Sequence, residues 1–121
     1  MIGVGLDVVD IDRFRRTLER TPTIVAKLFT AGEQAYAETA KDATERYAVR
    51  FAAKEAVMKA LGVGLGAIDW HDVEVVRSDT GCPSLVVTGR AAALAAEQGV
   101  TTWHLSLSHS TLVAEAIAIA E

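Results

Sequence analysis

The first nine residues, MIGVGLDVV, alternate between two faces. One face carries four apolar residues: Ile2, Val4, Leu6 and Val8. The other face carries Gly3, Gly5, Asp7 and Val9. Successive side chains of a strand point in opposite directions, so this alternation predicts a β-strand. Residues without side chains leave room beside Asp7 for another helix or a ligand to come close.

The stretch IDRFRRTLER follows the strand and has the spacing of an amphipathic helix. Asp10 or Asp12 can accept a hydrogen bond from the free amides of the first turn and cap it. The residues of its predicted buried stripe lie three and four positions apart: Ile11, Phe14 and Leu18. The pattern predicts a helix that packs on its apolar side.

A break at Pro22 separates this helix from two more helical segments. The stretch TIVAKLF is typical of a short helical piece. In TAGE, Thr30 and Glu33 have the spacing of a capping box, in which each side chain bonds the other's backbone amide. This signature predicts a helix that starts at Thr30 and runs towards Lys41.

The longest predicted helix runs from about Thr44 to Leu61 and stops at the glycines of GVGLG. At about 100° per residue, its alanines and one valine form a wide face of small residues. That face comprises Ala48, Ala52, Ala53, Ala56, Val57 and Ala60. A second apolar stripe comprises Tyr47, Phe51 and Met58. Arg50 and Lys54 are predicted to point to a side where solvation is easy.

The C-terminal half alternates between strands and one further helix. DVEVVRS and PSLVVTG flank DTGC as a predicted hairpin, and RAAALAAEQ is a predicted helix closed by Gly99. TWHLSLSHS and TLVAEAIAIA are two more predicted strands. The expected fold class is α+β, with a mostly antiparallel sheet packed with helices and one long central helix. The whole chain, residues 1–121, is expected to form a single domain.

Composition narrows the class of function. The chain is half apolar and 23% charged, with a net charge of −4. An acidic balance argues against nucleic-acid binding, because neutralising phosphates requires a basic surface. No apolar run is long enough to span a membrane, and the N-terminus lacks a signal-peptide pattern, so a cytoplasmic location is expected. The single cysteine, Cys82, excludes an internal disulfide and lies in a predicted turn.

Glu55 and Lys59 lie about 40° apart on the long helix, between its two apolar stripes. An exposed pair at this spacing is normally a weak ion pair that faces water. Between apolar surfaces, a carboxylate and an ammonium lose hydration and need partners such as a metal or a phosphate. Both interpretations remain open from the helix alone.

Asp7 is a second candidate carboxylate, although a lone aspartate near the end of a strand is more often a turn or cap residue. Two carboxylates suit Mg²⁺, which keeps several waters and takes further oxygens from substrate phosphates. They do not separate Mg²⁺ from Mn²⁺. Sequence spacing alone does not bring Asp7 and Glu55 together.

Two further features are weaker signals. In WHLSLSHS, His109 falls at the end of the predicted buried face, where it is as often structural as ligand-binding. The loop GVGLG, which begins at Gly62, follows a helix and matches no nucleotide-binding fingerprint. Glycine amides beside Lys59 could nevertheless approach phosphate oxygens. His71 and His104 lack metal-binding spacing and are expected to be structural.

Five segments, in order along the chain, resemble holo-acyl-carrier-protein synthase, the short bacterial type of 4′-phosphopantetheinyl transferase. These segments are GVGLDVVDIDRF, FTAGE, RFAAKEAVMKALGVGLG, GCPSLVVTG and SLSHS. The resemblance implies an enzyme that moves the phosphopantetheine arm of coenzyme A onto a serine of an apo acyl carrier protein and releases 3′,5′-ADP. It also implies a homotrimer with sites between subunits.

The resemblance also implies roles for individual residues. Asp7 and Glu55 would bind Mg²⁺ with the pyrophosphate of the coenzyme. Glu55, directly or through a metal-bound water, would help to deprotonate the serine. Lys59 would neutralise phosphate charge and assist the departing group. The coenzyme A contacts would also include Arg50, Lys59, Gly62 and His109. Phosphoryl transfer depends on positioning and charge stabilisation, which two carboxylates, Mg²⁺ and a lysine supply.

Arg13, Arg16 and Arg20 share one face of the first helix, opposite its apolar stripe. Such a face is often simply solvated, but in an acidic protein it suits docking of an acidic carrier protein. Two other functions fit some of these features. One is a different Mg²⁺-dependent phosphoryl transferase or hydrolase, and the other is a non-catalytic oligomeric binding module. The sequence does not indicate which carrier protein is served.

Overall fold

The computed structural model describes all 121 residues and contains five strands, five α-helices and one 3₁₀ turn. The elements follow in the order β1 (Gly3–Asp10), α1 (Ile11–Arg20), α2 (Ile24–Leu28), α3 (Ala31–Ala37), α4 (Thr44–Leu61), η1 (Trp70–Asp72), β2 (Val73–Arg77), β3 (Pro83–Val87), α5 (Gly89–Glu97), β4 (Trp103–His109) and β5 (Val113–Ala120). The predicted α+β class is confirmed. No helix is both long and apolar enough to cross a membrane.

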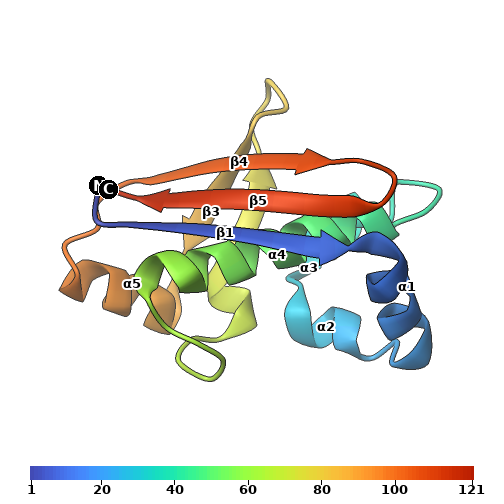
Figure 1. Cartoon of the computed structure of the whole chain (residues 1–121), viewed down its shortest axis with the longest axis horizontal. Coiled ribbons are helices and arrows are strands. Elements are labelled where there is room, and N and C mark those ends of the chain that lie inside the picture. The colour runs from blue at the N-terminus through green and yellow to red at the C-terminus, as the bar shows by residue number, and fades with distance from the viewer.

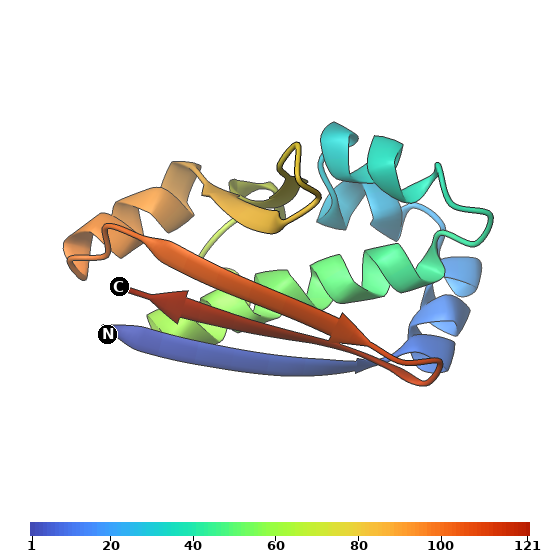
Figure 2. The same cartoon turned by 90° about the horizontal axis from the view of Figure 1, so that it is seen from above.

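The strands form two antiparallel sheets. One has the order β1-β5-β4, and the other is the hairpin of β2 and β3. Figures 1 and 2 show the three long strands as one layer, with α4 packed along one of its faces and the two chain termini close together. The remaining helices and the hairpin lie on the α4 side. The long central helix of the prediction is therefore the core of the fold.

Two glycines let β1 approach α4 more closely than any other residue would allow. A Cβ atom at Gly5 would lie 1.8 Å from the carbonyl oxygen of Ala56, and one at Gly3 would lie 2.0 Å from that of Ala60. The facing alanines of α4 are almost fully buried. The space predicted beside Asp7 is thus occupied by the backbone of α4, which places Asp7 alongside that helix.

The apolar face of β1 points away from α4. Its four residues remain exposed in the single chain, at 44% to 57%: Ile2, Val4, Leu6 and Val8. Ile117 and Ile119 of β5 pair with Leu6 and Val4 in register. Side chains directly opposite in an antiparallel pair share a face, so the outer side of the sheet carries a continuous apolar surface.

The prediction that Arg50 and Lys54 face water is wrong. Their relative exposures are 3% and 1%. Helix α3 and strand β2 cover that side of α4, and Glu33 pairs there with Lys54. A helical wheel shows which residues share a face, but it does not show which distant segments cover that face. The small-residue face of α4 is buried as predicted.

Most element boundaries agree with the prediction, with two exceptions. Thr30 and Glu33 form the complete capping box, yet α3 ends at Ala37 rather than continuing to Lys41. Arg46 of α4 donates hydrogen bonds to the carbonyl of Tyr36 and the hydroxyl of Thr39, which holds the chain in a turn there. The turn η1 was not predicted.

Candidate active site

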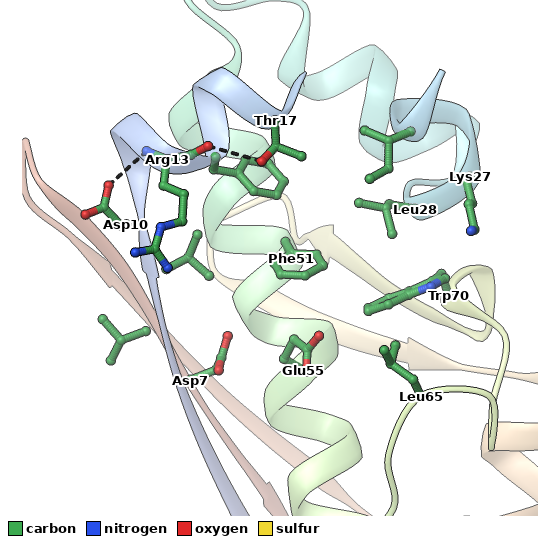
Figure 3. Close-up of a pocket in the computed structure, with 14 residues that line it drawn as sticks. Asp7, Asp10, Arg13, Thr17, Lys27, Leu28, Phe51, Glu55, Leu65 and Trp70 are labelled. Atoms are coloured by element: carbon green, nitrogen blue, oxygen red, sulfur yellow. Dashed lines mark hydrogen bonds between the residues drawn. The ribbon is translucent and has the colours of Figure 1, made fainter. Parts of the chain in front are cut away.

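A pocket of about 550 Å³ opens between β1, α1, α2, α4 and the loop that follows α4. Figure 3 shows Asp7 and Glu55 near each other at one end of it. Phe51, Trp70 and Leu65 line its apolar side. The pocket therefore joins a pair of carboxylates to an apolar wall, an arrangement common in sites for organic ligands with a charged group.

Asp7, Glu55 and Lys59 are brought together by the close packing of β1 on α4. The Nζ atom of Lys59 lies 3.0 Å from Oδ1 of Asp7 and donates a 2.9 Å hydrogen bond to the carbonyl of Leu6. The Asp7 side chain is 16% exposed, whereas that of Lys59 is 53% exposed. Lys59 thus keeps access to solvent, so of the two interpretations left open for this lysine, the loss of hydration is not observed.

Glu55 makes no ion pair with Lys59, because Lys59 is drawn to Asp7 on the neighbouring strand. Partial burial raises the pKa of the Glu55 carboxyl above its usual value. The nearby charge of Asp7 raises this pKa further, while Lys59 opposes the shift. The ionised form of Glu55 is thus held in an unfavourable environment that a bound cation would relieve.

The donor set of this site fits one hard cation. The fit rests on the two carboxylates, Asp7 and Glu55, that line the same pocket. Burial raises the pKa of Glu55, and the charge of Asp7 raises it further. The structure contains no group of three or more His, Cys, Asp or Glu side chains in metal-binding proximity. A cation such as Mg²⁺ does not need such a group, since waters and substrate phosphates complete its octahedron. Asp7 and Glu55 are the residues that could hold it.

The other predicted coenzyme contacts lie elsewhere in the single chain. His109 ends β4, and its Nε2 lies 2.9 Å from Oε1 of Glu45 beside a separate polar hollow. Arg50 is buried, with its guanidinium 4.5 Å from the centre of the Tyr36 ring. The structure therefore brings neither His109 nor Arg50 to the pocket of Asp7 and Glu55.

Gly62 ends α4 in the left-handed region, with φ of 72°. Its amide donates to the carbonyl of Lys59, so this amide is already used by the helix end. The loop that it opens contributes Leu65 to the pocket wall. Sequence reasoning linked this loop to phosphate binding and missed the apolar contact.

The three arginines of the predicted docking face, Arg13, Arg16 and Arg20, are exposed on α1. Arg13 also lines the pocket, on the side of Asp7. Arg15, between them in sequence, instead pairs with Asp12 and Asp42.

Sequence analysis missed Trp70, which stacks on Phe51 at 5.4 Å and lines the pocket. The sequence did contain a signal for the turn that carries Trp70. Asp69 and Asp72 flank Trp70 at capping-box spacing, and both reciprocal hydrogen bonds form around η1. The short turn is what fixes the direction of the indole.

Comparison with known proteins gives a consistent result. Residues 3–120 match the family model described as the 4′-phosphopantetheinyl transferase superfamily. A holo-acyl-carrier-protein synthase of Frankia casuarinae is 53% identical over 121 residues, which is 100% of this chain and 98% of the relative. Two solved structures, both of holo-acyl-carrier-protein synthases, superpose closely. The protein from Neisseria meningitidis has a TM-score of 0.91 and 28% identity, covering 100% of this chain and 98% of its own. The protein from Bacillus anthracis, in complex with coenzyme A (3′,5′-ADP), has a TM-score of 0.83 and 32% identity, covering 98% and 95%.

Proposed function

We propose that this chain, which belongs to the 4′-phosphopantetheinyl transferase superfamily, is a holo-acyl-carrier-protein synthase. It transfers the 4′-phosphopantetheine arm of coenzyme A to a serine of an apo acyl carrier protein, giving holo carrier protein and 3′,5′-ADP. The site observation that supports this best is the convergence of Asp7 and Glu55 from two elements at one pocket, with Lys59 paired to Asp7 beside them. As part of the proposal, the reaction takes place in the cytoplasm and serves fatty acid biosynthesis.

The reaction needs positioning and charge neutralisation rather than a covalent enzyme intermediate. The serine Oγ forms a bond to the phosphorus of the arm as the bond from that phosphorus to the departing 3′,5′-ADP breaks. The half-buried carboxylate of Glu55 accepts the serine proton, directly or through a water. The exposed ammonium of Lys59 faces solvent beside Asp7, where it neutralises charge on the phosphates and assists the departing group.

Asp7 and Glu55 would hold Mg²⁺ as the resident cofactor. When bound, the ion would neutralise charge on the pyrophosphate and help to align it for transfer. Support for this comes from the position of the two carboxylates in one pocket, where burial raises the pKa of Glu55 and the charge of Asp7 raises it further. Lys59, already 3.0 Å from Asp7, would remain a partner of that carboxylate.

Chelation with EDTA is expected to abolish transfer, and added Mg²⁺ to restore it. Asp7→Asn keeps the shape of the side chain but loses one negative ligand, so it should raise the Mg²⁺ concentration that gives half-maximal rate by at least about tenfold. Steady-state rates across a Mg²⁺ titration measure this. A wild-type Mg²⁺ dependence in Asp7→Asn would contradict the metal role.

A homotrimer with sites between subunits would unite the separated residues. In a single chain, His109 and Glu45 border a different hollow from that of Glu55. The apolar outer face of β1 gives a second copy a surface to bury, with Val4, Leu6 and Val8 each about half exposed. In the proposed trimer, the hollow of one subunit completes the pocket of the next.

Mixing two weakened variants tests this arrangement. Glu55→Gln and His109→Ala are each expected to be impaired, and co-refolded mixtures should regain activity because some sites then receive both intact residues. The wild-type mass in solution should be roughly three times 12.9 kDa by light scattering. A monomer, or a mixture no more active than its components, would refute shared sites.

We propose that the arginine face of α1 docks the carrier protein. Arg16 and Arg20 are exposed and make no ion pair within the chain, and Arg13 reaches the pocket edge. Exposed unpaired arginines beside a catalytic pocket would attract an acidic partner surface and align its serine with the pocket.

Arg16→Glu is the sharpest test, because Arg16 does not line the pocket. Charge reversal should raise the KM for carrier protein by about tenfold or more and leave the KM for coenzyme A nearly unchanged. Arg13→Glu should act in the same direction. Steady-state kinetics with each substrate varied in turn separate the two constants, and equal changes in both would rule out docking at this face.

A further inference from the structure

Lys54 precedes the proposed catalytic Glu55 in sequence, but it points in another direction and is fully buried. Its side chain is 1% exposed, and its Nζ lies 2.8 Å from Oε1 of Glu33. The Glu33 side chain is completely buried as well. Desolvation of two charges is costly, so burial of this pair calls for precise partners around it.

Besides its ion pair with Lys54, the Glu33 carboxylate accepts two backbone hydrogen bonds, one of which belongs to the cap of α3. One carboxylate oxygen accepts from the amide of Thr30, and the other accepts a 2.9 Å hydrogen bond from the amide of Val75 in β2. Together with Lys54, these bonds connect α3, α4 and β2. Glu33 therefore gives Lys54 a fixed anchor rather than a mobile counter-charge.

The ammonium of Lys54 also donates hydrogen bonds to the segment that carries Trp70. Its Nζ donates to the carbonyl of Trp70, at 3.1 Å, and to the carbonyl of Val73. These two carbonyls bracket η1, the turn that places the Trp70 indole against Phe51 at the pocket. The opposite side of η1 is tied to α2 by His71, whose Nε2 lies 2.8 Å from the carbonyl of Ala26.

We propose that Lys54, anchored by Glu33, is a positioning residue that holds Trp70 as the apolar wall of the Asp7–Glu55 pocket. The inference rests on the proposed function for its kinetic consequence, but its structural part stands on the hydrogen bonds alone. Because one ammonium bonds both ends of η1, loss of Lys54 removes two of the hydrogen bonds that hold the turn, so the indole should be held less firmly at the pocket wall. Lys54 does not contact the reacting atoms.

Two variants separate this role from simple stabilisation of the core. Lys54→Met combined with Glu33→Gln removes both charges, so no buried charge is left unpaired, and Gln can still accept from Val75. The matched control is Tyr47→Phe. Tyr47 is another buried side chain of α4, and this change deletes the hydrogen bond that its hydroxyl donates to Glu38. That bond has no connection to η1.

The first readout is shielding of Trp70. The chain has two tryptophans, so Trp103→Phe leaves Trp70 as the only one. In this background, quenching of Trp70 fluorescence by acrylamide should increase at least about twofold in the Lys54/Glu33 variant and stay unchanged in Tyr47→Phe. If a folded Lys54/Glu33 variant keeps wild-type shielding, the inference is overturned.

The second readout is kcat/KM for coenzyme A. The Lys54/Glu33 variant should lose about tenfold or more, because a displaced wall misplaces the substrate. Trp70→Ala should by itself also lower kcat/KM. When it is combined with the Lys54/Glu33 variant, the total loss should be little greater than the larger of the two separate losses, because both changes remove the same wall. Fully additive losses would mean that Lys54 acts elsewhere and would also overturn the inference.

The proposed function and the positioning role of Lys54 are tested by separate measurements. An inactive wild-type protein would reject the proposed function, while the quenching measurement would still decide the role of Lys54. If the doubly substituted variant does not fold, Lys54→Arg replaces it. This variant keeps the charge beside Glu33 but moves the donors that bracket η1, and the same results support or overturn the inference.

Discussion

Glu55→Gln is expected to lower the rate of phosphopantetheine transfer by about 10²- to 10⁴-fold while leaving the fold intact. The amide can neither accept the serine proton nor supply a negative ligand to a metal ion. Glu55 is on a helix whose packing faces are formed by other residues, so the isosteric change disturbs no core contact. Single-turnover transfer, with circular dichroism as the check on folding, measures the effect.

The same substitution should make the metal-free protein more stable at pH 7. The pKa of Glu55 is raised in the folded state, so the folded protein holds this proton more tightly than the unfolded chain does. Above the folded pKa, the ionised carboxylate therefore disfavours folding, and below the unfolded pKa the penalty vanishes. Glu55→Gln should raise the free energy of unfolding at pH 7, and the gain should fade as the pH falls through the raised folded-state pKa and vanish below the usual glutamate value.

Urea unfolding in EDTA at pH 7 and at pH 4 tests that sign. A variant that is less stable than wild type at pH 7 would show that Glu55 is stabilised by its surroundings. Near wild-type transfer by Glu55→Gln would reject its role as base and ligand together.

Gly5→Ala is expected to destabilise the fold by about 3 kcal/mol or more. The added methyl group would lie 1.8 Å from the carbonyl oxygen of Ala56. That oxygen belongs to helix backbone and cannot rotate aside, so β1 and α4 must separate. The separation would also move Asp7 away from Lys59, so the loss of stability should be accompanied by a loss of activity.

Gly64→Ala is the matched control, because a Cβ atom at Gly64 meets no atom within 4 Å and its backbone needs no left-handed conformation. Denaturant unfolding should give a near wild-type midpoint for Gly64→Ala and a much lower midpoint for Gly5→Ala. Equal stability of the two variants would mean that the contact of β1 with α4 is looser than the structure shows.

Local patterns were sufficient to predict the five strands and five α-helices of this fold, but not the turn η1. Alternation identified β1, the Thr30–Glu33 capping box started α3, and Gly62 ended α4 as expected. These features depend on a few neighbouring residues. The resemblance of five short segments to one family was likewise readable along the chain, and it is supported over residues 3–120.

Contacts between distant segments were not predictable in this way. The pairing of Lys59 with Asp7 rather than with Glu55 depends on the register of β1 against α4, across 52 positions of sequence. The burial of Lys54 depends on Glu33, which sequence analysis assigned only to a helix cap. The angular position of a charged residue on a helix does not determine its partner, because the partner comes from whichever element covers that side.

The most direct test of the proposed function is the intact mass of an apo acyl carrier protein after incubation with this protein, coenzyme A and Mg²⁺. The proposed synthase activity predicts a gain of one 4′-phosphopantetheine arm, together with release of 3′,5′-ADP. The gain should disappear in EDTA and with Glu55→Gln. No gain with several apo carrier proteins, under conditions where coenzyme A binds, would contradict the proposed function.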